Sequence, residues 1–464
     1  MARQFIGIDL GTSGVRTLIA DEVGQVLAKA SASVSSFTLS GVHEQDPHAW
    51  WDAVRTTVQK ALHRIGSHAQ ELAGIAVCGT SGTLVCADKA GTPLGPAIMY
   101  NDARGHNEAN FLRNTGHSNV SSSWSLPKVL WVKRHESSRF TATRYLLHQA
   151  DWIAGQLCGR FQSTDYSNAL KMGVNLDTET WPDWIDADVR ERLPTVVAPG
   201  THIGEVTSAT NNATGLLQGL PVIAGATDGV ASCIASGLGR MSDYNTTLGT
   251  TLIFKSLAET RPVHPLIYSH KLPGAVWLPG AASNTGGAWI DAWFPDADLQ
   301  ALEAAAARVL PSRYAAYPLT RRGERFPFVH QEAVALISPA LSDINRFAAC
   351  MQGTACLERL AYEVLDQATG ASGGAVYSTG GGSRSDVWMQ CRADICQRIF
   401  HRPACTDTAM GAAILAAGGT DFQSIQEATR QMTHVSRTFY PKRKMESVYG
   451  EFLALIRPYL DSPE

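Results

Sequence analysis

The chain has 464 residues, enough for roughly two to four domains. Hydrophobic residues make up 44% of it and charged residues 17%, a balance that supports a large packed core and argues against long disordered segments. The formal net charge is −3, and Lys and Arg are scattered, so no nucleic-acid partner is indicated. We expect no secretion signal, because no basic region followed by an apolar run comes after Met1, and the sequence has no apolar run of about 18 residues. With nine cysteines that form no zinc-type pairs, we expect a cytoplasmic protein with free thiols and no membrane partner.

The first 80 residues have the pattern of a strand meander followed by a helix and a further strand. Residues 4–34 predict three strands joined by tight turns at 11–14 and 21–25. Asp46 and Pro47 are typical of a helix cap and first turn, and the apolar residues up to Ile65 recur at helical spacing. Residues 72–77 then form a short buried strand. This order predicts an α/β domain, in which the first turn and the end of the fourth strand open on one side of the sheet.

A turn with the same pattern as the first one occurs about halfway along the chain, where a second domain could begin. Leu248-Gly249-Thr250-Thr251 echoes Leu10-Gly11-Thr12-Ser13, and both lie between apolar strands. Duplication of one α/β domain is therefore worth entertaining. Between the two turns, residues 220–224 predict a strand, and a helix opens near Asp228. Later, residues 376–379 predict a strand that enters three glycines, and residues 411–417 a helix of small residues.

Three places in this pattern could carry chemistry. Asp9 follows a buried strand and precedes a turn of glycines and hydroxyls, which suits a phosphate with Mg²⁺, although an ordinary hairpin explains it too. Asp228 could accept a proton from a substrate hydroxyl, or it could simply cap a helix. Gly380-Gly381-Gly382, with Ser385 at the next helix, would let a ligand approach the backbone closely; the alternative is a plain loop.

Other familiar motifs are absent from the sequence. It contains neither a G-x-x-x-x-G-K-[ST] loop nor a G-x-G-x-x-G turn after a strand, so ATP would have to bind through another architecture. There is no H-E-x-x-H, and the histidines form no cluster. Gly79-Thr80-Ser81-Gly82 is one residue short of a nucleophile elbow, which argues against a hydrolase serine.

Five segments in order resemble the FGGY carbohydrate kinases, in particular their xylulokinase-like branch. They are Ile8–Arg16, Ala224–Asp228, Thr247–Thr251, Ser378–Arg384 and Thr408–Ala413. The resemblance implies an α/β fold of two ribonuclease-H-like domains of the actin and hexokinase type, with an interdomain active-site cleft. We expect residues 1–237 to form an N-terminal sugar-binding domain and 238–425 a C-terminal nucleotide-binding domain. Residues 426–464 would be a helical tail packed on the body.

The resemblance also implies roles for single residues. Asp228 would be the general base for the sugar hydroxyl, and Asp9 would orient Mg²⁺, through water. The residues that would meet the transferring phosphate and the nucleotide are Gly11, Thr12, Ser13, Gly249, Thr250, Thr251, Gly380, Gly381, Gly382 and Ser385. ATP and Mg²⁺ are thus the expected cofactors, and a small sugar is the expected partner of a monomer or homodimer.

Two departures from the xylulokinase pattern bear on the substrate. A Met-His pair that is usual after the fourth strand is replaced here by Cys78–Gly82. This stretch, with Tyr100-Asn101 and Gln149–Trp152, resembles the D-ribulose kinases of the family, in which Ser81 would contact the ketose together with Asp9 and Asp228. Ser385 stands where an Asn is common, which puts the usual adenine contact in doubt.

The preferred reading is phosphorylation of a free pentulose, D-ribulose to D-ribulose 5-phosphate. Alternatives are a kinase for D-xylulose or another ketose or polyol, and, in another class, a catalytically silent sensor that binds ATP and sugar. Asn101, Asp102 and Arg104 either line the sugar pocket or form an exposed turn.

Overall fold

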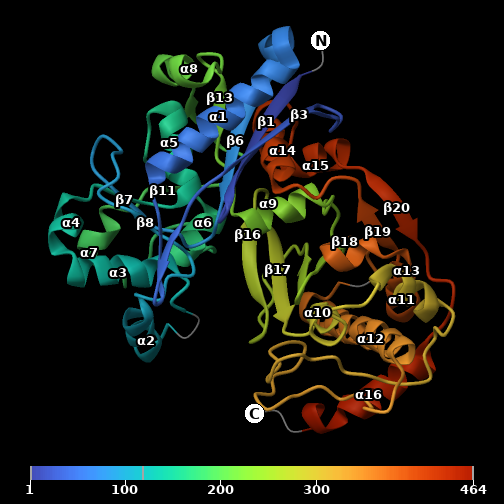
Figure 1. The fold of residues 1–464 in the computed structure, drawn as a ribbon. Helices are drawn as coiled ribbons and strands as arrows, with labels where there is room; N and C mark the ends of the chain where they lie inside the picture. The colour runs from blue at the N-terminus through green and yellow to red at the C-terminus, as the bar shows by residue number, and fades with distance from the viewer. Residues whose placement is uncertain (1–2, 118–119, 372, 462–464) are drawn as a thin grey trace. The chain divides into compact units, whose positions relative to one another are not determined.

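The computed structural model describes residues 3–117, 120–371 and 373–461, and they form two compact units. Unit 1 consists of residues 1–235, 270–275 and 405–433, and unit 2 of residues 236–269, 276–404 and 434–464. Each unit has a mixed sheet at its centre, and the labels in Figure 1 follow the chain through both sheets.

The sheet of unit 1 has six strands in the order β12-β13-β6-β1-β2-β3. Their bounds are β1 (Gln4–Gly11), β2 (Gly14–Asp21), β3 (Val26–Ser33), β6 (Leu72–Gly79), β12 (His202–Glu205) and β13 (Pro221–Ile223). The strands β1, β2 and β3 form the antiparallel meander expected from the sequence, while β6 runs parallel to β1 and β13 parallel to β6. The carboxyl ends of β1, β6 and β13 therefore lie side by side.

Successive residues of β1 point to opposite faces of this sheet, and a helix packs on each face. Ile6 and Ile8 belong to the hydrophobic core that also contains Val54 and Val58 of α1 (Pro47–Ile65). Gly7 faces the other way, onto α14 (Thr408–Thr420), so closely that a Cβ there would lie 1.8 Å from a backbone oxygen of that helix. As predicted, α1 begins at a cap formed by Asp46, whose carboxylate accepts from a first-turn amide, followed by Pro47.

The order β17-β15-β14-β18-β19-β20 in the sheet of unit 2 repeats the topology of the first sheet, and β16 adds a seventh strand at the edge. The seven strands lie in the order β16-β17-β15-β14-β18-β19-β20. Their bounds are β14 (Tyr244–Leu248), β15 (Leu252–Ser256), β16 (Tyr268–Leu272), β17 (Val276–Ser283), β18 (Val376–Thr379), β19 (Phe400–Pro403) and β20 (Val435–Phe439). The strands β14, β15 and β17 are antiparallel neighbours, β18 runs parallel to β14, and β19 runs parallel to β18. The two Leu-Gly-Thr-hydroxyl turns thus join corresponding strands of two similar sheets.

The units differ from the expected boundaries in their later parts. Residues 405–425, expected in the second domain, pack in unit 1, because α14 lies against β1, β6 and α9 (Asp228–Ala235). Small residues permit this packing: a Cβ at Gly411 would lie 2.0 Å from the Ala231 oxygen. Residues 426–464 do not form one helical tail either, since residues up to 433 belong to unit 1 and β20 adds a strand to the sheet of unit 2.

The remaining helices and strands complete both units. The helices are α2 (His106–Asn114), α3 (Ser125–His135), α4 (Ser137–Ala142), α5 (Gln149–Cys158), α6 (Tyr166–Ala169), α7 (Ala187–Arg190), α8 (Ser208–Thr214), α10 (Ala288–Trp293), α11 (Leu299–Ala307), α12 (Asp343–Thr369), α13 (Asp386–Cys396), α15 (Ile425–Met432) and α16 (Glu446–Leu460). The strands are β4 (Phe37–Leu39), β5 (Val42–Gln45), β7 (Val85–Ala87), β8 (Ala97–Ile98), β9 (Tyr145–Leu147), β10 (Ser163–Asp165) and β11 (Thr195–Val197).

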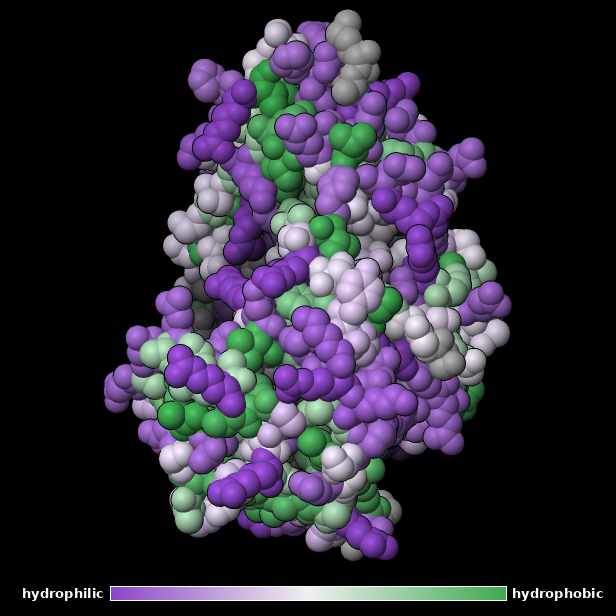
Figure 2. All heavy atoms as spheres, turned by 90° about the vertical axis from the view of Figure 1, so that its right-hand side faces the viewer, coloured by the Kyte–Doolittle hydropathy of each residue, from purple (hydrophilic) through white to green (hydrophobic). Residues whose placement is uncertain are grey.

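The surface is mixed in character. On the face shown in Figure 2, hydrophilic residues predominate and hydrophobic residues form separate groups between them. Among the residues described, no helix combines the length and the apolar character needed to cross a membrane.

Candidate active site

The ends of three parallel strands bring the predicted catalytic residues of unit 1 together. Asp9 lies near the end of β1, where it pairs in register with Cys78 of β6. Ser81 follows β6 by two residues, and Thr227, just before Asp228, bridges to Gly79. Crevices at the carboxyl ends of parallel strands are where α/β sheets bind ligands. The prediction that the first turn and the end of the fourth strand of the sequence pattern, β6, open on one side of the sheet is confirmed, because β1 and β6 are parallel and end side by side.

Asp9 is a buried carboxylate that interacts with one cation and, more weakly, with two other carboxylates. Its side chain is 3% exposed, and its Oδ2 accepts from the Arg16 guanidinium across the β1–β2 hairpin at 3.1 Å. Burial raises the pKa of Asp9 to about 6; Arg16 opposes the rise, whereas the charges of Asp228 and Asp407 add to it. Arg16 is half-exposed, so its charge is partly screened. An additional cation at this carboxylate would be electrostatically favourable.

Asp228 is the first residue of α9 and is half-buried. The close packing of the preceding segment explains its place: a Cβ at Gly225 would lie 1.7 Å from the Val77 oxygen of β6. The chain can therefore run directly against the end of β6 before the helix turns away. The negative charge of Asp228 contributes to the raised pKa of Asp9.

Ser81 presents a polar atom that the protein itself does not use. Its Oγ is buried and has no hydrogen-bond partner among the residues described. The Ser81 carbonyl, in contrast, accepts from the Lys171 ammonium at 3.1 Å. Burial lowers the pKa of Lys171, and the negative charge of Asp228 opposes this effect. Lys171 thus places a cation between the loop after β6 and the start of α9.

Hydrogen bonds to its carbonyl groups fix the turn between β1 and β2. The Thr12 carbonyl accepts from the Gln45 side chain at 2.6 Å, and the Ser13 carbonyl accepts from the Val34 amide at 3.1 Å. Gly11 and Thr12 are half-exposed and Ser13 is exposed. The carbonyls of this turn are thus fixed and its residues are at least half-exposed, so an anion could approach it; its role as a phosphate motif stays a prediction.

The turn between β14 and β15 in unit 2 is built differently. The Gly249 carbonyl accepts from the Gly287 amide at 2.7 Å, and the Thr250 carbonyl accepts from the Ala288 amide at 3.3 Å. A Cβ at Gly286 would lie 2.5 Å from the Thr251 Cα, so this segment rests on the turn itself. Thr250 is exposed and Gly249 and Thr251 are half-buried.

The triple glycine of unit 2 lies beside this turn. Thr247 and Thr379, which precede the two segments, share a hydrogen bond of 2.9 Å between their hydroxyls. Gly380 has a φ of +86°, and a Cβ there would lie 2.5 Å from the Leu248 oxygen, so two independent features require glycine. A Cβ at Gly381 would meet nothing within 4 Å. The structure therefore brings together the two segments that the sequence assigned to phosphate and adenosine.

Ser385 has a local role in the structure. It is the N-cap of α13, and its hydroxyl accepts from the Trp388 amide at 2.9 Å. This hydroxyl is therefore already engaged in capping the helix, and the effect of Ser385 on the adenine contact stays a prediction.

The three residues after β8 have protein partners. The Asp102 carboxylate accepts from the His43 amide at 2.7 Å and from Arg104 Nε at 3.0 Å. Arg104 also pairs with Glu44 at 2.8 Å and lies over the Trp131 ring. Asn101 is exposed and bonds to His43. Asp102 and Arg104 thus hold this turn together.

Two charged residues that interact with Asp9 or Asp228 were not predicted from the sequence. Asp407 caps α14, with its carboxylate accepting from the Ala409 amide, and acts electrostatically on Asp9. An aspartate before a helix of small residues is a cap signal that could have identified it. Lys171 lies in a 3₁₀ helix with no distinguishing pattern around it. Only the fold brings it to Ser81.

Comparison with known families assigns this architecture. Residues 4–235 match the N-terminal domain of the FGGY family of carbohydrate kinases, and residues 245–419 match its C-terminal domain. With two sheets of the same topology and these motifs at their strand ends, the protein is a carbohydrate kinase. The chain belongs to the FGGY family.

Individual relatives differ in the substrates for which they are named. The chain is 28% identical to xylulose kinase from Bacillus subtilis, over 97% of this chain and 95% of that protein. It is 25% identical to autoinducer-2 kinase from Yersinia enterocolitica, over 96% of this chain and 92% of that protein. The crystal structure of xylulose kinase from Rhodospirillum rubrum superimposes with a TM-score of 0.87 at 26% identity, covering 99% of this chain and 100% of the other.

Proposed function

We propose that this kinase transfers the γ-phosphoryl group of ATP to a free pentulose and converts D-ribulose to D-ribulose 5-phosphate. The observation that carries the proposal is the juxtaposition, at the ends of β1, β6 and β13, of Asp9, Asp228 and the buried, unpaired Oγ of Ser81. A buried hydroxyl without a hydrogen-bond partner lowers the stability of a protein. A hydroxyl of the sugar would provide that partner.

Asp228 is the residue for proton transfer in this proposal. Its carboxylate would accept the proton of the terminal sugar hydroxyl as that oxygen attacks phosphorus, a role that typically contributes about 10²–10⁴-fold. Its half-buried position at the start of a helix leaves it accessible to a substrate. The Lys171 ammonium interacts electrostatically with Asp228.

The nucleotide and its metal fit other residues of the chain. Asp9, whose burial is only partly compensated by Arg16, would hold Mg²⁺ through water beside the turn Gly11, Thr12 and Ser13. In unit 2, the turn Gly249–Thr251 would bind phosphate oxygens, and the open backbone at Gly380–Gly382 would accept the adenosine. When bound, Mg²⁺ neutralises charge on the phosphates.

The choice of sugar depends on the loop after β6. The family's D-xylulose kinases carry an imidazole at this loop, and here the corresponding stretch has small residues and two hydroxyls. The Thr80 hydroxyl is bonded to Thr83 and Gln149, which leaves the Ser81 hydroxyl for a substrate. This difference favours D-ribulose. D-Xylulose is the second candidate, because the Bacillus subtilis and Rhodospirillum rubrum relatives are named for that activity.

The test is coupled ADP release with D-ribulose, D-xylulose, L-ribulose, ribitol and glycerol, for the wild type and for Ser81→Ala. We expect the highest kcat/KM with D-ribulose and a loss of about 10-fold or more in Ser81→Ala, with a melting temperature no lower than that of the wild type because Oγ has no protein partner to lose. Ser40→Ala, at an exposed turn residue, is the matched control and should behave as the wild type. A preference for D-xylulose that Ser81→Ala leaves intact would contradict the assignment to D-ribulose. ATP binding without turnover of any sugar would favour the sensor instead.

A further inference from the structure

A buried chain of hydrogen bonds in unit 1 ends one residue before Asp228. Asp165, the last residue of β10, is 3% exposed, and its Oδ1 accepts from the Ser167 hydroxyl at 2.5 Å. The Ser167 Oγ in turn accepts from the backbone amide of Thr227 at 2.8 Å. All three residues are buried. About 60 residues separate Ser167 from Thr227 in the sequence, so only the fold makes this connection.

The direction of this chain is fixed by chemistry. A serine hydroxyl has one proton to donate, and an ionised carboxylate can only accept. The Ser167 proton therefore points to Asp165, and the lone pairs of Oγ are left for the Thr227 amide. The Asn168 side chain donates to the second oxygen of Asp165 at 2.5 Å and holds the carboxylate in place. Ser167 can thus adopt one orientation only.

Thr227 sets the start of the helix that carries Asp228. Its carbonyl accepts from the amides of Val230 and Ala231 at 3.0 and 2.9 Å, which closes the first turn of α9. Thr227 also bridges to Gly79 at the end of β6. A shift of the Thr227 peptide would consequently move Asp228.

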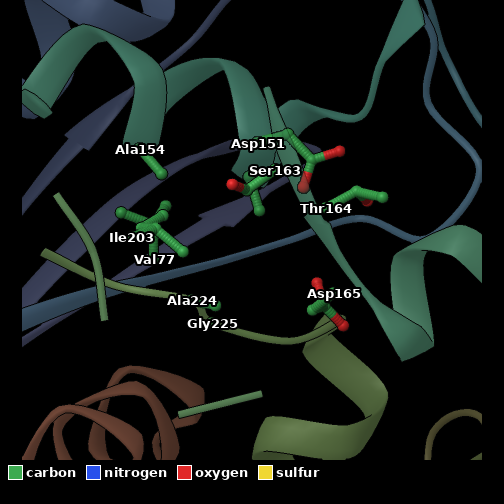
Figure 3. Close-up of a pocket in the computed structure, with 10 residues that line it drawn as sticks. Val77, Asp151, Ala154, Ser163, Thr164, Asp165, Ile203, Ala224 and Gly225 are labelled. Atoms are coloured by element: carbon green, nitrogen blue, oxygen red, sulfur yellow. The ribbon is translucent and has the colours of Figure 1, made fainter. Parts of the chain in front are cut away.

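The network lies beneath the candidate site and is not a substrate pocket. Figure 3 shows Asp165 beside the chain that continues from Ala224 and Gly225, next to a cavity that Asp151 and Thr164 also line. This cavity has a volume of about 10 Å³, which is room for about one water molecule and none for a sugar.

We propose that Asp165 and Ser167 are positioning residues, which hold the Thr227 peptide and thereby aim the Asp228 carboxylate at the sugar hydroxyl. The inference rests on the proposed function of Asp228 as the base. The competing explanation is that Asp165 merely caps α6, since it also accepts from the amides of Ser167 at 2.8 Å and Asn168 at 3.2 Å. The variant Ser167→Ala distinguishes the positioning role from the capping role, because it leaves these cap bonds intact and removes the bond to Thr227.

The experiment measures kcat and KM for the sugar in Ser167→Ala and Ser167→Cys, together with hydrogen exchange of the segment 226–231. In Ser167→Ala we expect kcat to fall by about 10- to 100-fold while the KM for the sugar changes by less than about 3-fold, because the binding groups stay and the base is misaligned. Amide exchange in the segment should be at least about 10-fold faster. Ser167→Cys keeps the size of the side chain and a weaker hydrogen-bonding group, so its kcat should lie between those of the wild type and Ser167→Ala.

The matched control is Thr207→Ala, which removes a different hydroxyl hydrogen bond in unit 1, that of a helix cap. The Thr207 hydroxyl accepts from the Thr210 amide at 3.1 Å at the start of α8. This variant should keep the kcat of the wild type. A kcat of Ser167→Ala within about 2-fold of Thr207→Ala would overturn the proposal. If Ser167→Ala does not fold, a wild-type kcat in Ser167→Cys would overturn the proposal. Full turnover in Asp228→Asn would refute the proposed function itself, which is a separate outcome.

Discussion

Replacement of Asp9 by Asn should stabilise the protein at neutral and alkaline pH while it removes a residue that the proposed function requires. Burial raises the pKa of this carboxyl from its ordinary 3.8 to about 6. The folded state therefore binds more protons than the unfolded state between these two pH values. Since stability changes with pH according to that difference, the free energy of unfolding falls as pH rises through this window, and the full penalty is present above about pH 6.

The magnitude follows from the size of the shift. About two pKa units correspond to about 3 kcal/mol at pH 8, and the penalty shrinks to about 1 kcal/mol near pH 4.5. Asparagine must itself be desolvated, so we expect a net gain of about 1–2 kcal/mol near pH 8. The exposed guanidinium of Arg16 loses little when its partner becomes neutral, because an amide oxygen can still accept from it.

Urea unfolding of the wild type and of Asp9→Asn at the two pH values measures this gain. Asp52→Asn is the control, because the Asp52 side chain is 66% exposed and should contribute little at either pH. The reasoning would be refuted if Asp9→Asn were less stable than the wild type near pH 8, or if its advantage were equally large near pH 4.5.

Two further predictions concern packing and buried charge. Gly7→Ala should lower the free energy of unfolding by at least about 2 kcal/mol, since its Cβ would lie 1.8 Å from the Ala409 oxygen and must push β1 away from α14. Gly450→Ala, in α16 with nothing within 4 Å, should instead raise it by about 0.5–1 kcal/mol; urea unfolding of the pair would contradict the packing argument if both changes had the same sign. Glu358→Gln should cost about 3–5 kcal/mol, because the Arg392 guanidinium, fully buried and 2.6 Å from Glu358, would keep its charge without a counterion. A thermal midpoint equal to that of the wild type would argue against this prediction.

Local patterns made much of the fold predictable. The meander of residues 4–34, the cap at Asp46 and the strands before Asp228 and Gly380 all follow from nearest-neighbour chemistry and periodicity, and the structure has them at the expected positions. The predicted placement of the first turn and the end of β6 on one side of the sheet also holds, because parallel strands align their carboxyl ends.

What the sequence could not show depends on contacts between distant segments. The packing of residues 405–433 in unit 1 results from the small side chains of α14 meeting Gly7 and Ala231, which no local pattern encodes. Lys171 reaches Ser81 across 90 residues, and Ser167 reaches Thr227 across 60. Such residues have ordinary local surroundings, and their roles become visible only when the strand ends are assembled.

The measurement that tests the central claim most directly is ADP release with D-ribulose by the wild type and by Asp228→Asn, with sugar binding measured for both by calorimetry. The account predicts sugar-dependent turnover in the wild type, and a kcat lowered by about 10²-fold or more in Asp228→Asn with sugar binding retained within about 10-fold. Near wild-type turnover in Asp228→Asn would show that Asp228 is not the base and would contradict the account.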